Sequence, residues 1–381
     1  MRHNSKMRSI VTGDVMLDNT TTKRIADPLI LGEEFDYLAL ENPSRDPVYC
    51  SKTPQKKAAV IATMRDEGLS ILEWVAHYQL IGFDSIFIYT NSNTDGSDDL
   101  LRALHVSGII TLINNPTPAK LSPQQKAYRH AFWFSEGVAD HEWVCFVDAD
   151  EFLFPIFEGE ALLVSPWIDR LRDRFDCSSV ALHWRLFHGE GEFEKTDGLL
   201  FERYREGHWR NCVKSVFRLR DAVAITAHYG VMNAAARMIN ASGEVIAKPS
   251  HVLPNPTGML GQINHYWNKS FQEFYVKRER GHGGRNPNLH EWTKFFNRGP
   301  FKDAANPYPS HEHIKLVHEE IKILRSLPGV KAAEDKVISN MRALMSSEIV
   351  RKTYEDTKQA WHAYAKQAWE ERLAARAAKS K

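Results

Sequence analysis

Short apolar runs alternate with amphipathic stretches through the first half of the chain. Four runs have the length of a strand and are rich in β-branched and aromatic residues, and they lie at residues 58–63, 85–89, 109–113 and 143–147. Helical patterns separate them, over residues 69–80, after Ser97, and from Ser122 to about residue 136. A strand, a loop and a helix thus repeat before the fourth strand. This order predicts an α/β fold with a mixed, mostly parallel sheet flanked by helices.

Residues that favour helix ends mark several of these boundaries. Ser122, Pro123 and Gln125 are residue types typical of the N-cap, the first helical position and the third, and Gly137 is expected to end that helix. Ser97 is predicted to cap the preceding helix, because two aspartates follow it and suit the positive end of a helix dipole. The helix boundaries therefore support the α/β interpretation.

The pattern is less regular between residues 155 and 300. Strands are predicted at residues 180–187 and 214–219, and the glycines of residues 281–285 predict a mobile loop that folds over a substrate. From His311 the chain becomes helical, with further helices at residues 337–345 and 354–378. We expect helices to dominate the last part of the chain.

These patterns divide the chain into three parts. Residues 1–55 are read as an N-terminal extension, residues 56–300 as an α/β domain, and residues 301–381 as a C-terminal helical region. The last helix is predicted to act as a cap or as an arm of a homo-oligomer. The alternative is a basic amphipathic surface that touches a membrane peripherally.

Two aspartates follow the fourth predicted strand directly. On an extended segment, residues i and i+2 point to the same side, so Asp148 and Asp150 can converge on one cation. Hard oxygen ligands suit Mg²⁺ or Mn²⁺. The alternative for the same residues is a solvated turn. Apolar residues flank the pair on both sides, and carboxylates in such surroundings need a partner, which favours the metal site.

Polar loops also follow the first two predicted strands, at residues 64–67 and 91–95. The carboxyl ends of parallel strands meet at one edge of a sheet, where ligands bind in such folds, so we expect these loops to lie beside Asp148 and Asp150. The chain has no Gly-x-Gly-x-x-Gly and no Gly-x-x-x-x-Gly-Lys-Ser/Thr sequence after a strand. Phosphates, if bound, are therefore expected to be held by a metal.

Composition argues against a nucleic-acid-binding, secreted or membrane-spanning protein. The 381 residues include 49 basic and 48 acidic ones, so no overall field points to nucleic acid. Four widely spaced cysteines fit a reducing compartment, and the chain has neither an apolar run near the roughly 18 residues of a membrane span nor a secretory signal. These features predict a cytoplasmic protein.

Several motifs, taken in order, resemble those of GT-A glycosyltransferases, in particular family 2-type enzymes and family 92. They are Arg65-Asp66-Glu67, Glu73-Trp74-Val75-Ala76-His77-Tyr78, Asn91-x-x-x-Asp95-Gly96, Gln125, Asp148-Ala149-Asp150-Glu151-Phe152-Leu153, His183-Trp184, and Asn264-His265-Tyr266-x-x-Lys269-Ser270-x-x-Glu273-Phe274-x-x-Lys277-x-x-Arg280-Gly281. The resemblance covers about residues 57 to 285. It implies a GT-A (Rossmann-like) fold and a nucleotide-sugar-dependent transferase that inverts the sugar's configuration.

The resemblance also implies roles for individual residues. Asp148 and Asp150 would hold Mn²⁺ or Mg²⁺ on the donor diphosphate, with His265 as the first and His228 as the second candidate for an added ligand. The residues expected near the nucleotide or its phosphates are Arg65, Glu67, Asn91, Asp95, Gln125, Asp148 and Lys269. Many relatives have Lys-Asn-Glu where this chain has Arg-Asp-Glu, which leaves the role of Asp66 open.

An inverting transfer needs a base for the acceptor hydroxyl. Glu190, Glu192 and Asp197 lie in the polar loop after the strand at residues 180–187, and Glu192 is the chosen candidate. The alternative for all three is a solvated loop. By analogy, the acceptor is expected to be a glycan, such as a polysaccharide, or a lipid-linked sugar.

Three other readings use the same residues. A sugar-1-phosphate nucleotidyltransferase shares the metal chemistry but favours a glycine-rich basic loop after the first strand, which residues 64–68 do not supply. An Asp-x-Asp phosphatase usually has Thr or Val two places after the second aspartate, where this chain has Phe152. A non-catalytic carbohydrate-binding protein with the same fold would not need an intact aspartate pair.

Overall fold

The computed structural model describes residues 47–116, 122–189, 191–281, 292–296 and 307–379. Most of the predicted N-terminal extension, Glu190 and four residues of the predicted glycine loop, 282–285, lie outside these ranges. In the part of the extension that is described, a 3-10 helix at Val48–Ser51 buries Tyr49, whose hydroxyl donates to the Ala222 carbonyl at 2.7 Å.

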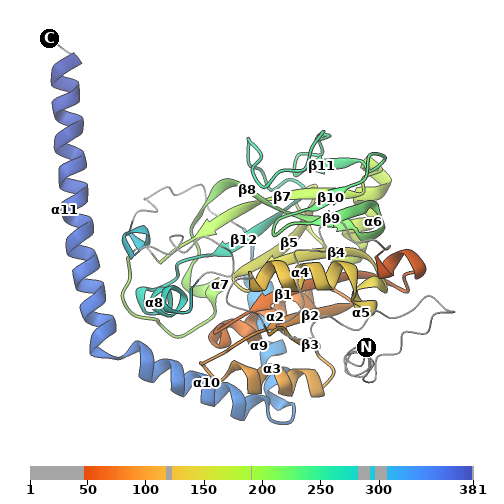
Figure 1. The fold of residues 1–381 in the computed structure, drawn as a ribbon, viewed down its shortest axis with the longest axis horizontal. Helices are drawn as coiled ribbons and strands as arrows, with labels where there is room; N and C mark the ends of the chain where they lie inside the picture. The colour runs from red at the N-terminus through yellow and green to blue at the C-terminus, as the bar shows by residue number, and fades with distance from the viewer. Residues whose placement is uncertain (1–46, 117–121, 190, 282–291, 297–306, 380–381) are drawn as a thin grey trace, which may run out of the picture.

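The first half of the chain builds a parallel sheet in the order β3-β2-β1-β4 (Figure 1). The strands are β1 (Lys56–Met64), β2 (Ser85–Thr90), β3 (Thr111–Asn114) and β4 (His141–Asp148). The helices between them are α2 (Ile71–Leu80), α3 (Ser97–Val106), α4 (Pro123–Trp133) and α5 (Glu136–Ala139). Each element of the predicted repeat is present, so the α/β prediction is confirmed for this half.

The second half extends the same sheet on the β4 side with mixed pairing, in the order β4-β8-β7-β12-β5-β6. β8 is antiparallel to both β4 and β7, whereas β12 is parallel to β7 and antiparallel to β5. The elements are β5 (Glu151–Phe157), β6 (Glu160–Ala161), α6 (Val164–Phe175), β7 (Ser179–Phe187), α7 (Leu200–Arg203), β8 (Gly207–Arg218), β9 (Ala222–Ile225), β10 (Gly230–Met232), β11 (Met238–Asn240), β12 (Gly261–Tyr266) and α8 (Phe271–Glu279). The predicted mixed, mostly parallel sheet is confirmed.

The alternation of side chains along β1 divides the core into two layers. Val60 belongs to a cluster with residues of α2, α3 and α6, whereas Ile61 belongs to a cluster with residues of α4 and α5. Both side chains are fully buried, as expected for a strand at the centre of a sheet with helices on both faces. Trp74 is buried, and its indole N–H donates to the Glu151 carbonyl at 3.1 Å.

The structure corrects two predicted helix ends. The N-cap of α3 is Gly96, with φ of 94°, and Ser97 is already helical; the Asp95 carboxylate accepts the Ser97 N–H at 2.9 Å. α4 ends at Trp133 rather than near residue 136, and Gly137 lies inside α5. The Ser122 cap of α4 is as predicted, since its hydroxyl accepts the Gln125 N–H at 3.3 Å.

The helices after residue 307 pack on the α/β body. α9 (His311–Ser326) buries the predicted stripe of Ile314, Val317, Ile321 and Leu324 and contacts α2, where His77 Nδ1 lies 2.9 Å from His313 Nε2. α10 (Val330–Met345) lies against α3, and α11 (Glu348–Lys379) extends away from the body (Figure 1). The predicted oligomer arm and membrane surface stay predictions, because the basic side chains at the end of α11 lie outside the described ones.

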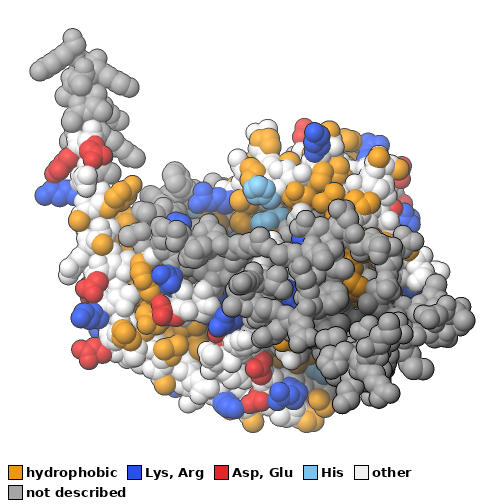
Figure 2. Space-filling model, viewed as in Figure 1, with side chains coloured by type: hydrophobic (Ala, Val, Ile, Leu, Met, Phe, Trp, Pro, Cys, Tyr) orange, Lys and Arg blue, Asp and Glu red, His pale blue; other side chains and the backbone are white. Residues whose placement is uncertain are grey.

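The surface carries both charges side by side. Figure 2 shows basic and acidic side chains interspersed over the described part of one face, including α11. In the part of the chain that the structure describes, no helix is long and apolar enough to cross a membrane.

α8 is fixed to the body by a buried ion pair at its first turn. Glu273 forms a capping box with Ser270, and its carboxylate accepts both terminal N–H groups of Arg203, at 2.5 and 3.0 Å. Burial alone would raise the pKa of Glu273, but Arg203 and the Ser270 hydroxyl outweigh it and lower the pKa to about 2. The first turn of α8 is thereby held rigidly, which sets the direction of the side chains further along the helix.

We expect Glu273→Gln to lower the free energy of unfolding by about 3 kcal/mol at pH 7, because Arg203 stays buried without its partner. The folded-state pKa of Glu273 lies below the ordinary glutamate value of 4.5. The carboxylate's contribution is therefore complete above pH 4.5 and is lost as the pH falls toward 2. Urea unfolding at pH 7 and pH 3 measures this. Glu279→Gln, at the exposed end of the same helix, is the matched control; an equal loss in both variants would contradict the prediction.

Candidate functional site

A large open cavity lies at the carboxyl ends of β1 and β4. It encloses about 1620 Å³ of space, part of it open to solvent. Its walls come from the loops after β1, β2 and β4, the start of α4, the strands β7, β8 and β12, and the last turn of α8. The lining residues are Thr63, Met64, Arg65, Glu67, Asn91, Ser122, Pro123, Gln124, Gln125, Asp148, Ala149, Asp150, Trp184, Cys212, Ala227, His228, His251, His265, Trp267, Lys277, Arg280 and Gly281.

Asp148 is the last residue of β4 and pairs in register with Thr63 of β1. Its carboxylate accepts hydrogen bonds from the Gln124 amide at 2.6 Å and from Lys214 Nζ at 3.3 Å. Burial favours the neutral acid, but Lys214 outweighs it and holds the pKa of Asp148 below its usual value. About a third of the side chain, 34%, stays exposed to the cavity. Asp148 is thus ionised and accessible.

Asp150 lies in the tight turn between β4 and β5. Its carboxylate is 2.5 Å from Lys277 Nζ and 3.5 Å from His265 Nε2, and its carbonyl accepts the Tyr266 N–H at 2.9 Å. Burial acts against ionisation, yet Lys277 and then His265 hold the pKa of Asp150 well below its usual value. The aspartate is therefore charged and fully engaged by basic groups.

Lys214 lies beneath the pair of aspartates. Its ammonium is 3.3 Å from Asp148 and 3.2 Å from Glu151, and it donates to the Ala227 carbonyl at 2.8 Å. Burial would lower the pKa of Lys214, but the two carboxylates raise it above its usual value. Burial raises the pKa of Glu151 to about 8 even with Lys214 beside it. A buried network therefore supports the turn that carries the aspartates.

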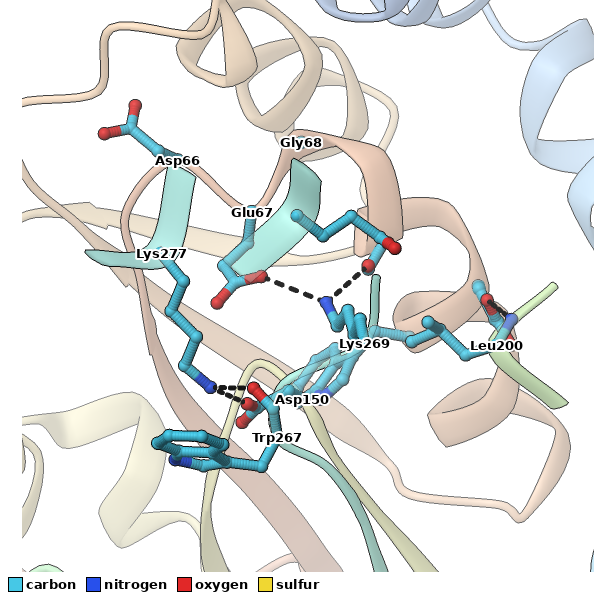
Figure 3. Close-up of polar contacts among 12 residues, drawn as sticks. Asp66, Glu67, Gly68, Asp150, Leu200, Trp267, Lys269 and Lys277 are labelled. Atoms are coloured by element: carbon cyan, nitrogen blue, oxygen red, sulfur yellow. Dashed lines mark hydrogen bonds and ion pairs between the residues drawn. The ribbon is translucent and has the colours of Figure 1, made fainter. Parts of the chain in front are cut away.

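A second charge cluster joins the loop after β1 to α8. Glu67 lies 3.6 Å from Lys269 Nζ (Figure 3). It also pairs with Arg280, which donates to the Arg65 carbonyl. Burial acts to raise the pKa of Glu67, whereas Arg280 and Lys269 lower it below its usual value. The cluster ties the predicted nucleotide-side loop to the C-terminal half of the site.

Two acidic side chains hold the loop after β2 against the loop after β1. One oxygen of Asp95 accepts the Gly68 N–H and the other the Ser97 N–H, both at 2.9 Å. Asp66 accepts the N–H groups of Thr94 and Asp95, at 2.5 and 3.1 Å. Asp95 is buried and is not among the residues that line the cavity, so it joins the loops together instead of facing a ligand.

The structure brings most of the predicted site residues to one cavity. Those on its wall are Arg65, Glu67, Asn91, Gln125, Asp148, Asp150, His228 and His265. Asp95 and Lys269 lie behind the wall, and the Glu192 side chain is exposed and is not among the lining residues. Sequence reasoning missed Gln124 and Lys214. Gln124 lies next to the predicted Gln125, but the signal for Lys214, a lone cation inside an apolar run, is weak.

The side chains present suit a divalent cation chemically. Asp148, Asp150 and His265 offer oxygen and nitrogen donors on one cavity wall, and His265 Nδ1 is buried with no hydrogen-bond partner among the described residues. Burial lowers the pKa of His265, which keeps the ring in the neutral form that binds metal. Within the described ranges, however, no three His, Cys, Asp or Glu side chains stand close enough to form a ready metal site.

Comparison with known families decides the class of this fold. The model of glycosyltransferase family 92 matches residues 61–294, more than half of the chain and nearly the whole α/β body. The chain belongs to glycosyltransferase family 92. This confirms the family and the enzyme class that the motifs predicted. A family 92 protein from Ricinus communis is 28% identical over 93 residues, which are 24% of this chain and 16% of that protein.

Solved glycosyltransferase structures resemble the family 92 chain only weakly. S. aureus TarS 1–349 in complex with UDP is 13% identical with a TM-score of 0.30, covering 76% of this chain and 90% of that one. Glucosyl-3-phosphoglycerate synthase from Mycobacterium tuberculosis, in complex with Mn²⁺, UDP and phosphoglyceric acid, is 14% identical with a TM-score of 0.25, covering 34% and 44%. Scores this low carry no argument about the ligands of the present cavity.

Proposed function

We propose that the chain transfers a sugar from a nucleoside-diphosphate sugar to a hydroxyl group of a glycan or lipid-linked acceptor, with the help of Mn²⁺ or Mg²⁺. The observation that carries the proposal is the position of Asp148 and Asp150. Both stand at the carboxyl end of β4, on the wall of a cavity with room for a nucleotide sugar. Membership of family 92 supports the same reaction class.

Different residues of the cavity would bind different parts of the donor. A divalent cation held by Asp148, Asp150 and His265 would offset the charge that develops on the leaving diphosphate. Arg65, whose side chain is 41% exposed on the cavity wall, is placed to bind phosphate oxygens. Asn91 contributes an amide to the same wall, suited to the nucleoside.

We extend the proposal to inversion of the sugar's configuration, as the motifs predict. The exposed side chain of Glu192, the candidate base for the acceptor proton, lies off the cavity wall. Proton NMR of the glycoside product gives the anomeric configuration of the new linkage directly. A product with the donor's own configuration would contradict this part of the proposal.

The decisive experiment is thermal unfolding with a panel of nucleoside diphosphates, each with and without Mn²⁺. A ligand at 100 times its Kd stabilises the native state by about 2.7 kcal/mol, which raises the midpoint by several degrees. We expect one nucleotide to raise it only when Mn²⁺ is present. No shift with any nucleotide would favour the non-catalytic carbohydrate-binding fold instead. A shift with a nucleoside triphosphate and a sugar phosphate, but not with a diphosphate, would favour the nucleotidyltransferase.

A further inference from the structure

α8 presents a lysine to the second aspartate of the pair. Lys277 Nζ lies 2.5 Å from Asp150 Oδ2, donates to the Trp267 carbonyl at 2.8 Å, and stands 5.2 Å from the centre of the Trp267 ring (Figure 3). The other carboxylate oxygen of Asp150 faces His265 Nε2 at 3.5 Å. Both oxygens of Asp150 are therefore occupied by groups of this chain.

Each carboxylate of the described cavity wall has a basic partner. Asp148 faces Lys214, Asp150 faces Lys277, and Glu67 faces Arg280. A divalent cation entering this balanced site adds charge beside existing cations, which disfavours its binding. A diphosphate that enters with the cation cancels this excess positive charge. Charge balance thus favours joint binding of metal and nucleotide over binding of the metal alone.

Of the two lysines that face the aspartates, Lys277 is the one placed to move. Lys214 is 1% exposed, contacts two carboxylates and a carbonyl, and does not line the cavity. Lys277 is 14% exposed and lines the cavity at the end of a flexible four-carbon stem. Its ammonium can leave Asp150 and stay in the same polar space.

We propose that Lys277 is a resident counter-ion of the metal position: it holds Asp150 while the donor is absent, and a divalent cation must displace it. The displaced ammonium then turns to the diphosphate, so metal and nucleotide bind cooperatively. This inference rests on the proposed function for its ligands. Lys277 is therefore a positioning residue. Its removal should strengthen the binding of the cation alone and reduce the amount by which the diphosphate improves that binding.

The test is the affinity for Mn²⁺ alone, measured on the whole chain from the EPR signal of the free ion. We expect Lys277→Gln to bind Mn²⁺ at least about 10-fold more tightly than the unchanged protein, because the competing cation is gone and an amide still donates to Asp150. We expect UDP, or whichever diphosphate shifts the thermal midpoint, to improve Mn²⁺ binding less in the variant, since cooperativity between two ligands is reciprocal.

The controls separate this effect from a general change in charge. Arg278 is the neighbouring positive charge on α8; its guanidinium lies over the Trp292 ring, 5.3 Å from the centre, and does not line the cavity. Arg278→Gln should therefore leave Mn²⁺ binding unchanged. Adding Asp150→Asn to Lys277→Gln should abolish the gain. Lys277→Met repeats the test if the glutamine variant does not fold.

Mn²⁺ binding by the neutral Lys277 variants that is equal to or weaker than that of the unchanged protein overturns the inference. So does an equal gain in Arg278→Gln. The affinity for Mn²⁺ alone is measured without nucleotide and without turnover, so its outcome does not depend on whether the protein is a transferase. Failure of every nucleoside diphosphate to bind would count against the transferase, whereas the Mn²⁺ comparison alone decides the role of Lys277.

Discussion

Asparagine in place of Asp150 is expected to lower the rate of sugar transfer by about 10³-fold while the protein stays folded, an effect comparable to removing one key electrostatic group from an enzyme site. The substitution keeps the size and the hydrogen-bonding capacity of the side chain but removes the charge that a divalent cation needs. Lys277 loses its partner, yet its side chain borders the open cavity and can find water. The loss should therefore appear in catalysis more than in stability.

The rate to follow is the release of nucleoside diphosphate from the sugar nucleotide that the thermal-shift panel identifies. Glu160→Gln is the matched control, because it removes an acidic group from the edge strand β6, where Glu160 pairs at the surface with Arg170. It should change the rate by less than about 2-fold, as is usual for surface substitutions. Full turnover by Asp150→Asn would exclude the proposed metal role of this aspartate.

Elements with local signals were predictable from the sequence. β1, β2 and β4 are short apolar runs bounded by turns, and α4 carries its capping serine and proline, so each pattern is complete within a dozen residues. Asp148 and Asp150 were predictable for the same reason, since their spacing on an extended segment places them on one side. The convergence of three loops at one edge followed from the parallel order of the strands.

β12 was missed because tertiary packing, and not local periodicity, makes it a strand. β12 contains Gln262, Asn264 and His265, yet every residue of it is buried between β7 and β5. The polar side chains satisfy one another and the backbone: the Gln262 amide donates to Asn264 at 2.6 Å, and Asn264 to the Tyr308 carbonyl at 3.1 Å. Polar residues in the core read as a loop in a hydropathy pattern.

The basic partners of the two aspartates could not be predicted from the residues next to them in the sequence. Lys214 reaches Asp148 because β8 pairs antiparallel with β4, with Cys145 opposite Val216, and nothing near either residue encodes that register. Lys277 approaches Asp150 from α8, 127 residues further along the chain. The position of Asp95 near the nucleotide stays a prediction, and in the structure both of its carboxylate oxygens accept backbone N–H groups.

Methionine in place of Lys214 is expected to lower the free energy of unfolding at pH 9 by about 3–5 kcal/mol, the usual cost of removing one partner of a buried ion pair. Asp148 can turn toward the cavity, because a third of it is exposed, but Glu151 is fully buried and cannot reach water. Urea unfolding at pH 6 and pH 9 tests the size of the effect and its origin. A loss below about 1 kcal/mol at both pH values would contradict the ion-pair assignment.

The pH dependence follows from Glu151. Burial raises its folded-state pKa to about 8, above the ordinary glutamate value of 4.5. Its carboxyl group therefore favours the folded state fully below pH 4.5 and progressively less as the pH rises through 8. At pH 6 Glu151 is protonated with or without Lys214. At pH 9 only the lysine allows it to ionise in place, so the loss caused by Lys214→Met should be larger at pH 9. Adding Glu151→Gln to Lys214→Met removes the buried carboxyl group that has lost its partner. The double variant should recover most of the extra loss of stability seen at pH 9. This recovery would assign the extra loss to the Lys214–Glu151 pair and not to the changed volume of the side chain at position 214.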